Sequence, residues 1–192
     1  MTIPNVTASA RGAGSGDVLP DLLGPGLRVV FCGTVAGTVS AARGAYYAGP
    51  GNRFWPILAA TGLTPRLFRP AEFRCLLAIG IGLTDLAKSV SGADTALPAR
   101  AFDAAGLSAR IRAARPAMLA FNGKKAAATF LNIPGPRLAY GPGPVLPDFP
   151  PVFVLPSTSG AARANWDPAP WFALAAALSP PAPAGSASAA GR

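Results

Sequence analysis

Short, nearly continuous runs of apolar residues alternate along the chain with segments in which apolar residues recur at helical spacing. The continuous runs are typical of strands buried on both faces, and they cover residues 27–32, 75–82, 117–121 and 152–155. The helical segments cover residues 52–62, 64–68, 102–115, 124–128 and 167–178. Strands that alternate with helices are joined by right-handed crossovers and form a mainly parallel sheet. The pattern therefore predicts a three-layer α/β/α sandwich with a short, mainly parallel central sheet.

Each predicted strand leads into a short polar or glycine-rich loop. The four loops comprise residues 33–37, Thr84 with Asp85, Asn122 with Gly123, and residues 157–163. Because the carboxyl ends of parallel strands meet at one edge of a sheet, and ligands bind there, we expect the loops to form one site. In the first loop Gly33 and Gly37 flank small residues, which lets backbone N–H groups approach a ligand closely. An ordinary transition from strand to loop is the alternative.

The length and composition predict one globular domain between two flexible ends. The chain has 192 residues, 51% of them apolar, which is enough for a single sizeable core. Residues 1–25 and 179–192 are rich in Gly, Ala, Ser and Pro, so we predict a flexible leader, a folded domain over residues 26–178 and a flexible tail. We find neither a signal-peptide pattern nor an apolar run of membrane-spanning length, and we expect a cytoplasmic monomer with no membrane partner.

Charge and residue usage narrow the chemistry further. The chain has 17 basic and 8 acidic residues, a net charge of +9 that favours a polyanionic partner such as nucleic acid, although an arginine-rich bacterial proteome would also explain it. It has no histidine, which excludes imidazole acid–base chemistry, a serine–histidine triad and histidine metal ligation. Cys32 and Cys75 stand in apolar runs where they are expected to pack. We therefore expect neither a metal nor another cofactor.

Four blocks of sequence carry a resemblance to a known family. They are residues 27–37, residues 52–55 (Asn-Arg-Phe-Trp), residues 121–124 (Phe-Asn-Gly-Lys) and residues 154–163. In this order and at this spacing they resemble the uracil-DNA glycosylase superfamily, and within it the mismatch-specific uracil/thymine-DNA glycosylases most of all. The resemblance covers residues 23–178. It implies a monofunctional enzyme that flips deoxyuridine out of DNA, hydrolyses its N-glycosidic bond and leaves an abasic site.

The resemblance also implies roles for individual residues. Gly33, Thr34 and Val35 occupy the positions that cradle the base and place the attacking water, through the backbone in the case of Val35. Tyr47 falls where an aromatic ring stacks on the flipped base. The loop that grips phosphates and wedges into the duplex corresponds to residues 157–163. The chain departs from the family in two places, since Val35 replaces the usual Asn or acidic residue and Ser157-Thr158 replaces the Asn-Pro of the mismatch-specific branch.

The residues themselves suggest how the missing polar group is replaced. Asp85, at the end of a neighbouring strand, could orient the water or hold the sugar cation electrostatically. Capping the following helix or pairing with Lys88 is the alternative role for this carboxylate. The hydroxyl groups of Ser157 and Thr158 could also hold the water.

Other side chains are candidates for the base and for the DNA backbone. Asn122 can accept from N3–H and donate to O4 of uracil, or serve only as a turn residue. Tyr46 could replace Tyr47 as the stacking ring, and Phe54 is a further base-binding candidate for which packing in the core is the alternative. The candidates for DNA contacts are Arg53, Lys124, Lys125, Ser159, Gly160, Ala161 and Arg163. A solvent-exposed helix face would explain the two lysines as well.

Two functions of different classes follow from these observations. The first is a uracil-DNA glycosylase acting on uracil-containing DNA in base-excision repair. The second is a catalytically weak or inactive protein that binds uracil or abasic sites in DNA, which Val35 favours because its side chain cannot hydrogen-bond. An enzyme acting on a small nucleotide is disfavoured by the basic excess and by the wedge-like loop.

Overall fold

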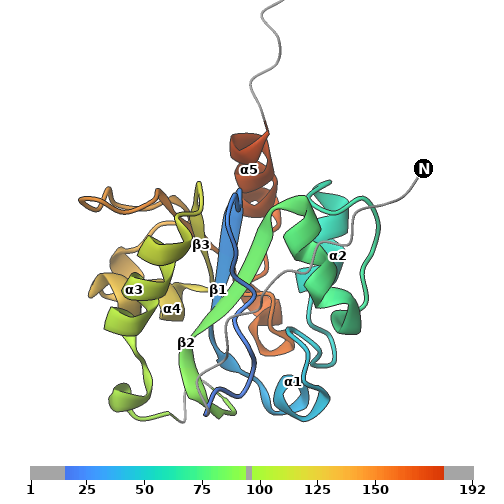
Figure 1. The fold of residues 1–192 in the computed structure, drawn as a ribbon, viewed down its shortest axis with the longest axis horizontal. Coiled ribbons are helices and arrows are strands. Elements are labelled where there is room, and N and C mark those ends of the chain that lie inside the picture. The colour runs from blue at the N-terminus through green and yellow to red at the C-terminus, as the bar shows by residue number, and fades with distance from the viewer. Residues whose placement is uncertain (1–15, 94–96, 180–192) are drawn as a thin grey trace, which may run out of the picture.

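The computed structural model describes residues 16–93 and 97–179 and shows a central sheet covered by helices on both faces (Figure 1). The sheet has five strands in the order β2-β1-β3-β5-β4. Four of them run parallel: β1 (Val29–Ala36), β2 (Ile81–Ser91), β3 (Leu119–Asn122) and β5 (Val152–Leu155). The short β4 (Gly141–Pro142) pairs with β5 in the antiparallel direction. The predicted α/β/α sandwich with a mainly parallel sheet is confirmed.

Helices follow the strands along the chain. The α-helices are α1 (Thr38–Arg43), α2 (Phe54–Ala60), α3 (Ala104–Ala114), α4 (Lys124–Leu131) and α5 (Ala169–Leu178). Short 3₁₀ helices cover Pro70–Ile79, Ala99–Ala101, Gly135–Arg137 and Gly160–Asn165. In Figure 1, α3 and α4 lie on one side of the sheet and α2 lies on the other. None of the helices in the described ranges is both long enough and apolar enough to span a membrane.

The alternation of side chains along β1 builds a separate core on each face of the sheet. Val29 and Phe31 point into the core that contains α2 and α5, where Phe31 lies 5.4 Å from Phe54, centroid to centroid, with the rings at 88°. Val30 and Cys32 point into the core beneath α3 and α4. All four side chains are fully buried, so this part of the strand is apolar on both faces, as its sequence predicted.

Two of the predicted strand boundaries are wrong, and both errors concern the site. We predicted that the first strand ends at Gly33, but β1 continues to Ala36 because β2 pairs with it along that length. We predicted a second strand over residues 75–82 with a loop at Asp85. Residues up to Ile79 instead form a 3₁₀ helix that ends at Gly80, where φ is +75°, and Asp85 lies inside β2. A short apolar run fits a strand and a buried helix equally well.

Other element predictions have mixed outcomes. The predicted helix over residues 64–68 is absent: residues 64–66 form bends, and residues 67 and 68 have no regular secondary structure. The strand over residues 152–155 is confirmed, as are helices close to residues 102–115, 124–128 and 167–178. The strand predicted over residues 117–121 forms two residues later at its start, over Leu119–Asn122.

The predicted leader is wrong for the part of it that the structure describes. Leu19 and Leu22 are buried in the core, and Leu22 forms an antiparallel bridge with Leu83 on the outer edge of β2. Val18 N donates to Lys88 O at 2.7 Å, so residues 18–22 lie along this edge strand. We call residues 17–22 the strap. The strap is ordered because β2 offers it unpaired backbone groups, which its Gly- and Pro-rich neighbourhood does not reveal. Residues 1–15 and 180–192, the rest of the predicted ends, lie outside the described residues.

Candidate functional site

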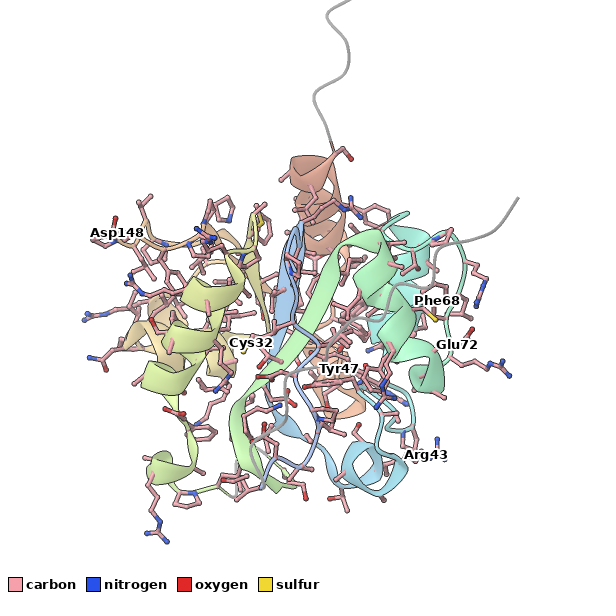
Figure 2. The ribbon with its side chains drawn as sticks, viewed as in Figure 1. Cys32, Arg43, Tyr47, Phe68, Glu72 and Asp148 are labelled. Carbon is pink, nitrogen blue, oxygen red and sulfur yellow. The ribbon has the colours of Figure 1, made fainter. Side chains whose placement is uncertain are left out.

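A cavity of about 700 Å³ opens at the carboxyl edge of the parallel strands. Its lining comes from all the segments that we predicted to converge there: residues 33–40, Tyr46, Tyr47, Asp85, Asn122 and residues 157–162. Figure 2 shows Tyr47 near the centre of the molecule, whereas Arg43 and Asp148 lie at its periphery. The strap adds Leu19 to the wall. The sequence analysis missed Leu19, and the spacing of Leu19 and Leu22 in an otherwise non-periodic segment was the one available signal.

Strand β1 runs beyond its neighbour β3 and thereby leaves one of its edges open to this cavity. The pairing with β3 ends at Cys32 opposite Phe121, whereas the pairing with β2 continues to Ala36 opposite Ser91. On the β3 side, the backbone groups of residues 33–36 have no strand partner in the described sheet. Because these residues line the cavity, the unpaired backbone groups of this edge are available for hydrogen bonds to a ligand.

Asp85 lies directly against Gly33 at the base of the cavity. The two residues are partners in the β1–β2 register. A Cβ atom on Gly33 would collide with Asp85 Oδ1 and would lie 3.4 Å from the Tyr47 hydroxyl oxygen. Glycine is therefore required at position 33 for the carboxyl group to occupy this place.

The environment of Asp85 raises its pKa to about 7, first because burial disfavours the charged form and then because of the negative charge of Asp21. Lys88 and Arg110 act in the opposite direction. The residue is 3% exposed, and no side chain or backbone group in the described ranges donates a hydrogen bond to its carboxylate oxygens. A carboxyl group with this pKa exchanges a proton near neutral pH, which is a property of catalytic acids and bases.

The alternative roles that we considered for Asp85 do not occur. Lys88 pairs instead with Asp21, at 2.8 Å, and with Asp17, at 3.8 Å. The N-cap of α3 is Asp103, whose side chain accepts from Gly106 N at 2.7 Å. Asp85 therefore contributes its carboxyl group to the cavity and to neither a helix cap nor a salt bridge.

Tyr47 has a strained backbone and a well-supported ring. Its φ is +55°, a left-handed conformation that is uncommon for a residue with a large side chain. The ring stacks on Phe54 with centroids 3.9 Å apart and an interplanar angle of 26°. Phe54 is fully buried and does not line the cavity, so it supports Tyr47 from behind, in agreement with its alternative role in the core. Strained residues that are held by packing concentrate at functional sites.

Tyr46 has a different environment from its neighbour. It is 1% exposed, and its hydroxyl donates to Pro20 O at 3.2 Å, which ties the strap to the wall of the cavity. Its ring packs edge-on against Phe73. Tyr47 Oη, by contrast, is buried without a hydrogen-bond partner in the described part of the chain.

Two hydrogen bonds between Asn122 and Thr158, which we call the latch, join the ends of β3 and β5. Asn122 Nδ2 donates to Thr158 Oγ1 at 2.8 Å, and Thr158 N donates to Asn122 Oδ1 at 2.9 Å. Thr158 O in turn accepts from Arg53 N at 2.9 Å, which fixes the start of α2. The amide keeps one proton and one lone pair for a ligand. Thr158 is fully buried, whereas Ser157 beside it is partly exposed.

We expect Asn122→Ala to lower the free energy of unfolding by about 1–3 kcal/mol, because the buried N–H group of Thr158 loses its acceptor. Urea unfolding followed by circular dichroism measures the effect. Thr158→Ser keeps both hydrogen bonds and is the matched control, with a smaller expected loss. An Asn122→Ala protein as stable as the parent would show that the latch carries no stability.

Of the residues predicted to contact DNA, Ser159, Gly160 and Ala161 line the cavity, whereas the basic residues Arg53, Lys124, Lys125 and Arg163 do not. The Arg53 guanidinium lies 5.2 Å from the Trp166 ring centroid, and the Arg163 guanidinium lies against Gly51. Gly160 approaches the backbone of Pro50 so closely that a Cβ there would be 2.8 Å from Pro50 O. Ser159 and Ala161 lie on the same loop, and both are exposed.

The two lysines at the start of α4 point toward different aromatic rings. Lys124 Nζ lies 4.4 Å from the ring centroid of Tyr140, and Lys125 Nζ lies 5.6 Å from that of Phe102. Tyr140 immediately precedes β4, whose Gly141 pairs with Val154 near the carboxyl end of β5. Lys124 is therefore at the same edge of the sheet as the cavity.

Groups of side chains that could bind a metal ion were sought across the described part of the chain. Within residues 16–93 and 97–179, no group of three or more Asp, Glu, Cys or His side chains is close enough to bind a metal ion. The Cys32 thiol is buried, and burial raises its pKa, so a reactive thiolate is disfavoured. The polar groups that line this cavity include Asp85, the hydroxyl-bearing residues Thr34 and Ser157, the Asn122 amide and the open edge of β1.

Comparison with known proteins identifies the family to which this architecture belongs. The model of the uracil DNA glycosylase superfamily matches residues 20–177, which include the end of the strap, every strand and the whole cavity edge. The chain belongs to the uracil DNA glycosylase superfamily. The match begins within the strap, six residues before the predicted start of the domain at residue 26.

A solved structure shows the same superfamily fold. The solution NMR structure of a proposed uracil DNA glycosylase from Methanosarcina acetivorans superposes with a TM-score of 0.59 at 22% sequence identity, over 83% of this chain and 96% of that chain. At this identity the likeness concerns the fold. The roles of individual residues in this member of the uracil DNA glycosylase superfamily rest on its own geometry.

Proposed function

We propose that the protein is a uracil-DNA glycosylase of the mismatch-specific branch, which flips deoxyuridine out of DNA, hydrolyses its N-glycosidic bond and leaves an abasic site for base-excision repair. It would act as a monomer on DNA in the cytoplasm. Family membership, the cavity and the net charge of +9 support a DNA substrate. The single observation that carries the enzymatic proposal is the carboxyl group of Asp85, which lies against Gly33 with a pKa of about 7.

The proposed reaction begins with cleavage of the bond between C1′ of the sugar and N1 of uracil. The bonding electrons leave with the base, and backbone N–H groups on the open edge of β1 stabilise the resulting anion. The Asp85 carboxylate stabilises the sugar cation and orients a water molecule. The water oxygen adds to C1′, its proton passes to Asp85, and the proton is then released to solvent or to the departing base.

Asp85 would thus replace the polar side chain that Val35 lacks. Val35 lines the cavity but can contribute only its backbone groups. The hydroxyl groups of Thr34 and Ser157 also line the cavity and can hold the same water. Thr158 would act indirectly, because its hydroxyl already binds Asn122.

Base recognition would combine stacking with one edge contact. Phe54 covers one face of the Tyr47 ring, so the flipped base would stack on the other face. The remaining proton and lone pair of the Asn122 amide match O4 and N3–H of uracil, whereas cytosine offers the reverse arrangement at these two positions.

Binding to the phosphate backbone would offset the cost of extruding the nucleotide, which is a few kcal/mol. The residues proposed for this grip are Arg53, Lys124, Lys125, Ser159, Gly160, Ala161 and Arg163. Ser159, Gly160 and Ala161 line the cavity on the loop after β5, and Arg163 lies on the same loop. Arg53 precedes α2, and the two lysines begin α4.

A protein that binds uracil or abasic sites with little or no turnover is the second candidate. Two observations favour it: Val35 has no polar side-chain atom, and the Asn122 amide is partly occupied by Thr158. Such a protein would retain affinity for substrate and product while failing to break the bond.

A single-turnover assay with excess protein tests the proposal. Labelled oligonucleotides would carry one uracil in a single strand, opposite guanine or opposite adenine, and alkali would reveal abasic sites. Cleavage at the uracil supports the glycosylase. Absence of cleavage with a retained, uracil-selective gel shift overturns the enzymatic proposal in favour of the binding protein.

A further inference from the structure

A partly buried ion cluster lies next to Asp85, and the proposed mechanism does not use it. Asp21, on the strap, is its centre. Asp21 Oδ1 pairs with Lys88 Nζ at 2.8 Å and accepts from Thr84 Oγ1 at 2.7 Å. Asp21 Oδ2 pairs with Arg110 Nε at 3.1 Å. A single carboxylate thus links the strap, strand β2 and helix α3.

The cluster holds the segment of β2 that carries Asp85. The side chains of Thr84 and Lys88, which flank Asp85 along the strand, both bind Asp21. From α3, Arg110 donates from its NH2 group to the backbone carbonyl of Asp85 at 3.1 Å. Thr84, Lys88 and Arg110 therefore each connect Asp21 to the backbone segment that carries Asp85.

The cluster also contacts the part of the cavity wall that the strap forms. Lys88 Nζ donates to the backbone carbonyl of Leu19, which lines the cavity, and lies 3.4 Å from the hydroxyl oxygen of Tyr46. The Lys88 side chain is only 8% exposed, so these contacts take place out of solvent. A lysine buried to this degree is normally retained only where its charge is compensated.

We propose that Asp21, Lys88 and Arg110 are positioning residues for Asp85, and that the strap carboxylate with its two cations determines which charge Asp85 carries when it faces the cavity. This inference rests on the proposed catalytic role of Asp85.

The charge balance gives the direction of each contribution. With Asp17, which lies 3.8 Å from Lys88, the cluster contains two carboxylates and two cations and is neutral. An ionised Asp85 adds one uncompensated negative charge to a buried site. Removal of the Asp21 charge should therefore ease ionisation of Asp85, and removal of a cation should oppose it.

The other titratable groups that face Asp85 do not supply a compensating charge. Cys32 lies near it on β1, and Tyr46 and Tyr47 lie near it on the loop after α1. Burial, followed by the proximity of Asp85, raises the pKa of each of these three groups well above its usual value. They stay neutral near pH 7, so the charges that act on Asp85 in the described part of the chain are those of Asp21, Lys88 and Arg110.

Two variants with opposite expected signs test the inference. Asp21→Asn should lower the pKa of Asp85 by about 0.5–1 unit, and Arg110→Gln should raise it by a similar amount. Carbon-13 NMR of the side-chain carboxyl groups, with the Asp85 signal assigned by its absence in Asp85→Asn, measures the pKa without requiring activity. The acid limb of the single-turnover rate against pH should move in the same directions.

The Arg110 side chain is 24% exposed, so its replacement disturbs the core less. Arg110→Gln therefore still tests the inference if Asp21→Asn does not fold. Asp148→Asn and Arg137→Gln, both at exposed positions, are the matched controls and should move neither the NMR signal nor the acid limb. A lower rate with an unmoved acid limb and an unmoved NMR pKa would indicate a structural role only and would overturn the inference. Opposite NMR shifts in proteins that cleave no uracil would support it while overturning the proposed glycosylase.

Discussion

Asp85→Asn is expected to lower the single-turnover rate of uracil release by about 100- to 10,000-fold, the usual contribution of a positioned acid or base. In the proposed mechanism the Asp85 carboxylate is the active form, and the pKa of this group is about 7. The parent rate should therefore fall tenfold for each pH unit below about 7, whereas the residual rate of Asp85→Asn should lack this dependence. Pre-steady-state cleavage measured between pH 5 and pH 9 provides both comparisons.

The same substitution should make the protein more stable above neutral pH. The folded protein holds the Asp85 proton up to about pH 7, whereas the carboxyl group of an unfolded chain loses it near pH 3.9. Stability conferred by the protonated group is thus lost as the pH rises between these values. Asn cannot ionise and carries no such cost. The free energy of unfolding of Asp85→Asn should therefore exceed that of the parent by about 1–3 kcal/mol at pH 8, and by less at pH 4.

Urea unfolding at the two pH values measures the stability of both proteins. Asp148→Asn replaces an exposed aspartate of positive φ, a conformation that Asn tolerates well, and serves as the control with unchanged rate and stability. A parent-like rate in Asp85→Asn would remove this carboxylate from the mechanism. Equal stabilities of Asp85→Asn and the parent at pH 8 would argue against a desolvated carboxyl group.

Gly33→Ala is expected to reduce uracil release by about 100-fold or more, through displacement of the Asp85 carboxyl group. The backbone at Gly33 is ordinary strand, so alanine is sterically acceptable to the chain itself. The added Cβ collides with Asp85 Oδ1, the end of a side chain that can rotate away. The loss of stability should accordingly stay within the range of about 1–3 kcal/mol typical of overpacking, while the loss of activity is large.

A double-mutant cycle separates this mechanism from general damage. If Gly33→Ala acts through Asp85, the double variant Gly33→Ala with Asp85→Asn should be no slower than Asp85→Asn alone. Gly135→Ala is the matched control, because no atom lies within 4 Å of its ideal Cβ position. Rate losses that multiply in the double variant would show that Gly33 contributes independently of the carboxyl group, for instance through its backbone.

The elements that the sequence predicted well are those whose signals are local. The strand over residues 152–155 and the helices close to residues 102–115 and 167–178 are confirmed because apolar spacing and proline or arginine boundaries lie within each segment. The convergence of four segments on one cavity also follows from strand order, since parallel strands place their carboxyl ends together.

The errors arose where a partner distant in sequence changed the local preference. Residues 33–36 remain in strand β1 because β2 pairs with them, and Asp85 enters β2 although its polarity is typical of a loop. The strap is ordered because the edge of β2 pairs with Leu22 and because Lys88 binds Asp21. None of these interactions has a counterpart within a window of neighbouring residues.

The sequence by itself determined the fold class, the superfamily and the chemistry that is absent, because hydrophobic period, short motifs and residue inventory are properties of the chain. Only the tertiary structure decided the contacts and the protonation of the polar groups that the chain does contain. It placed Asp85 against Gly33, engaged the Asn122 amide with Thr158, and brought Asp21 to Thr84 across 63 positions of sequence. Burial and charge proximity, which set a pKa and the access of a side chain to substrate, exist only once distant segments have packed together.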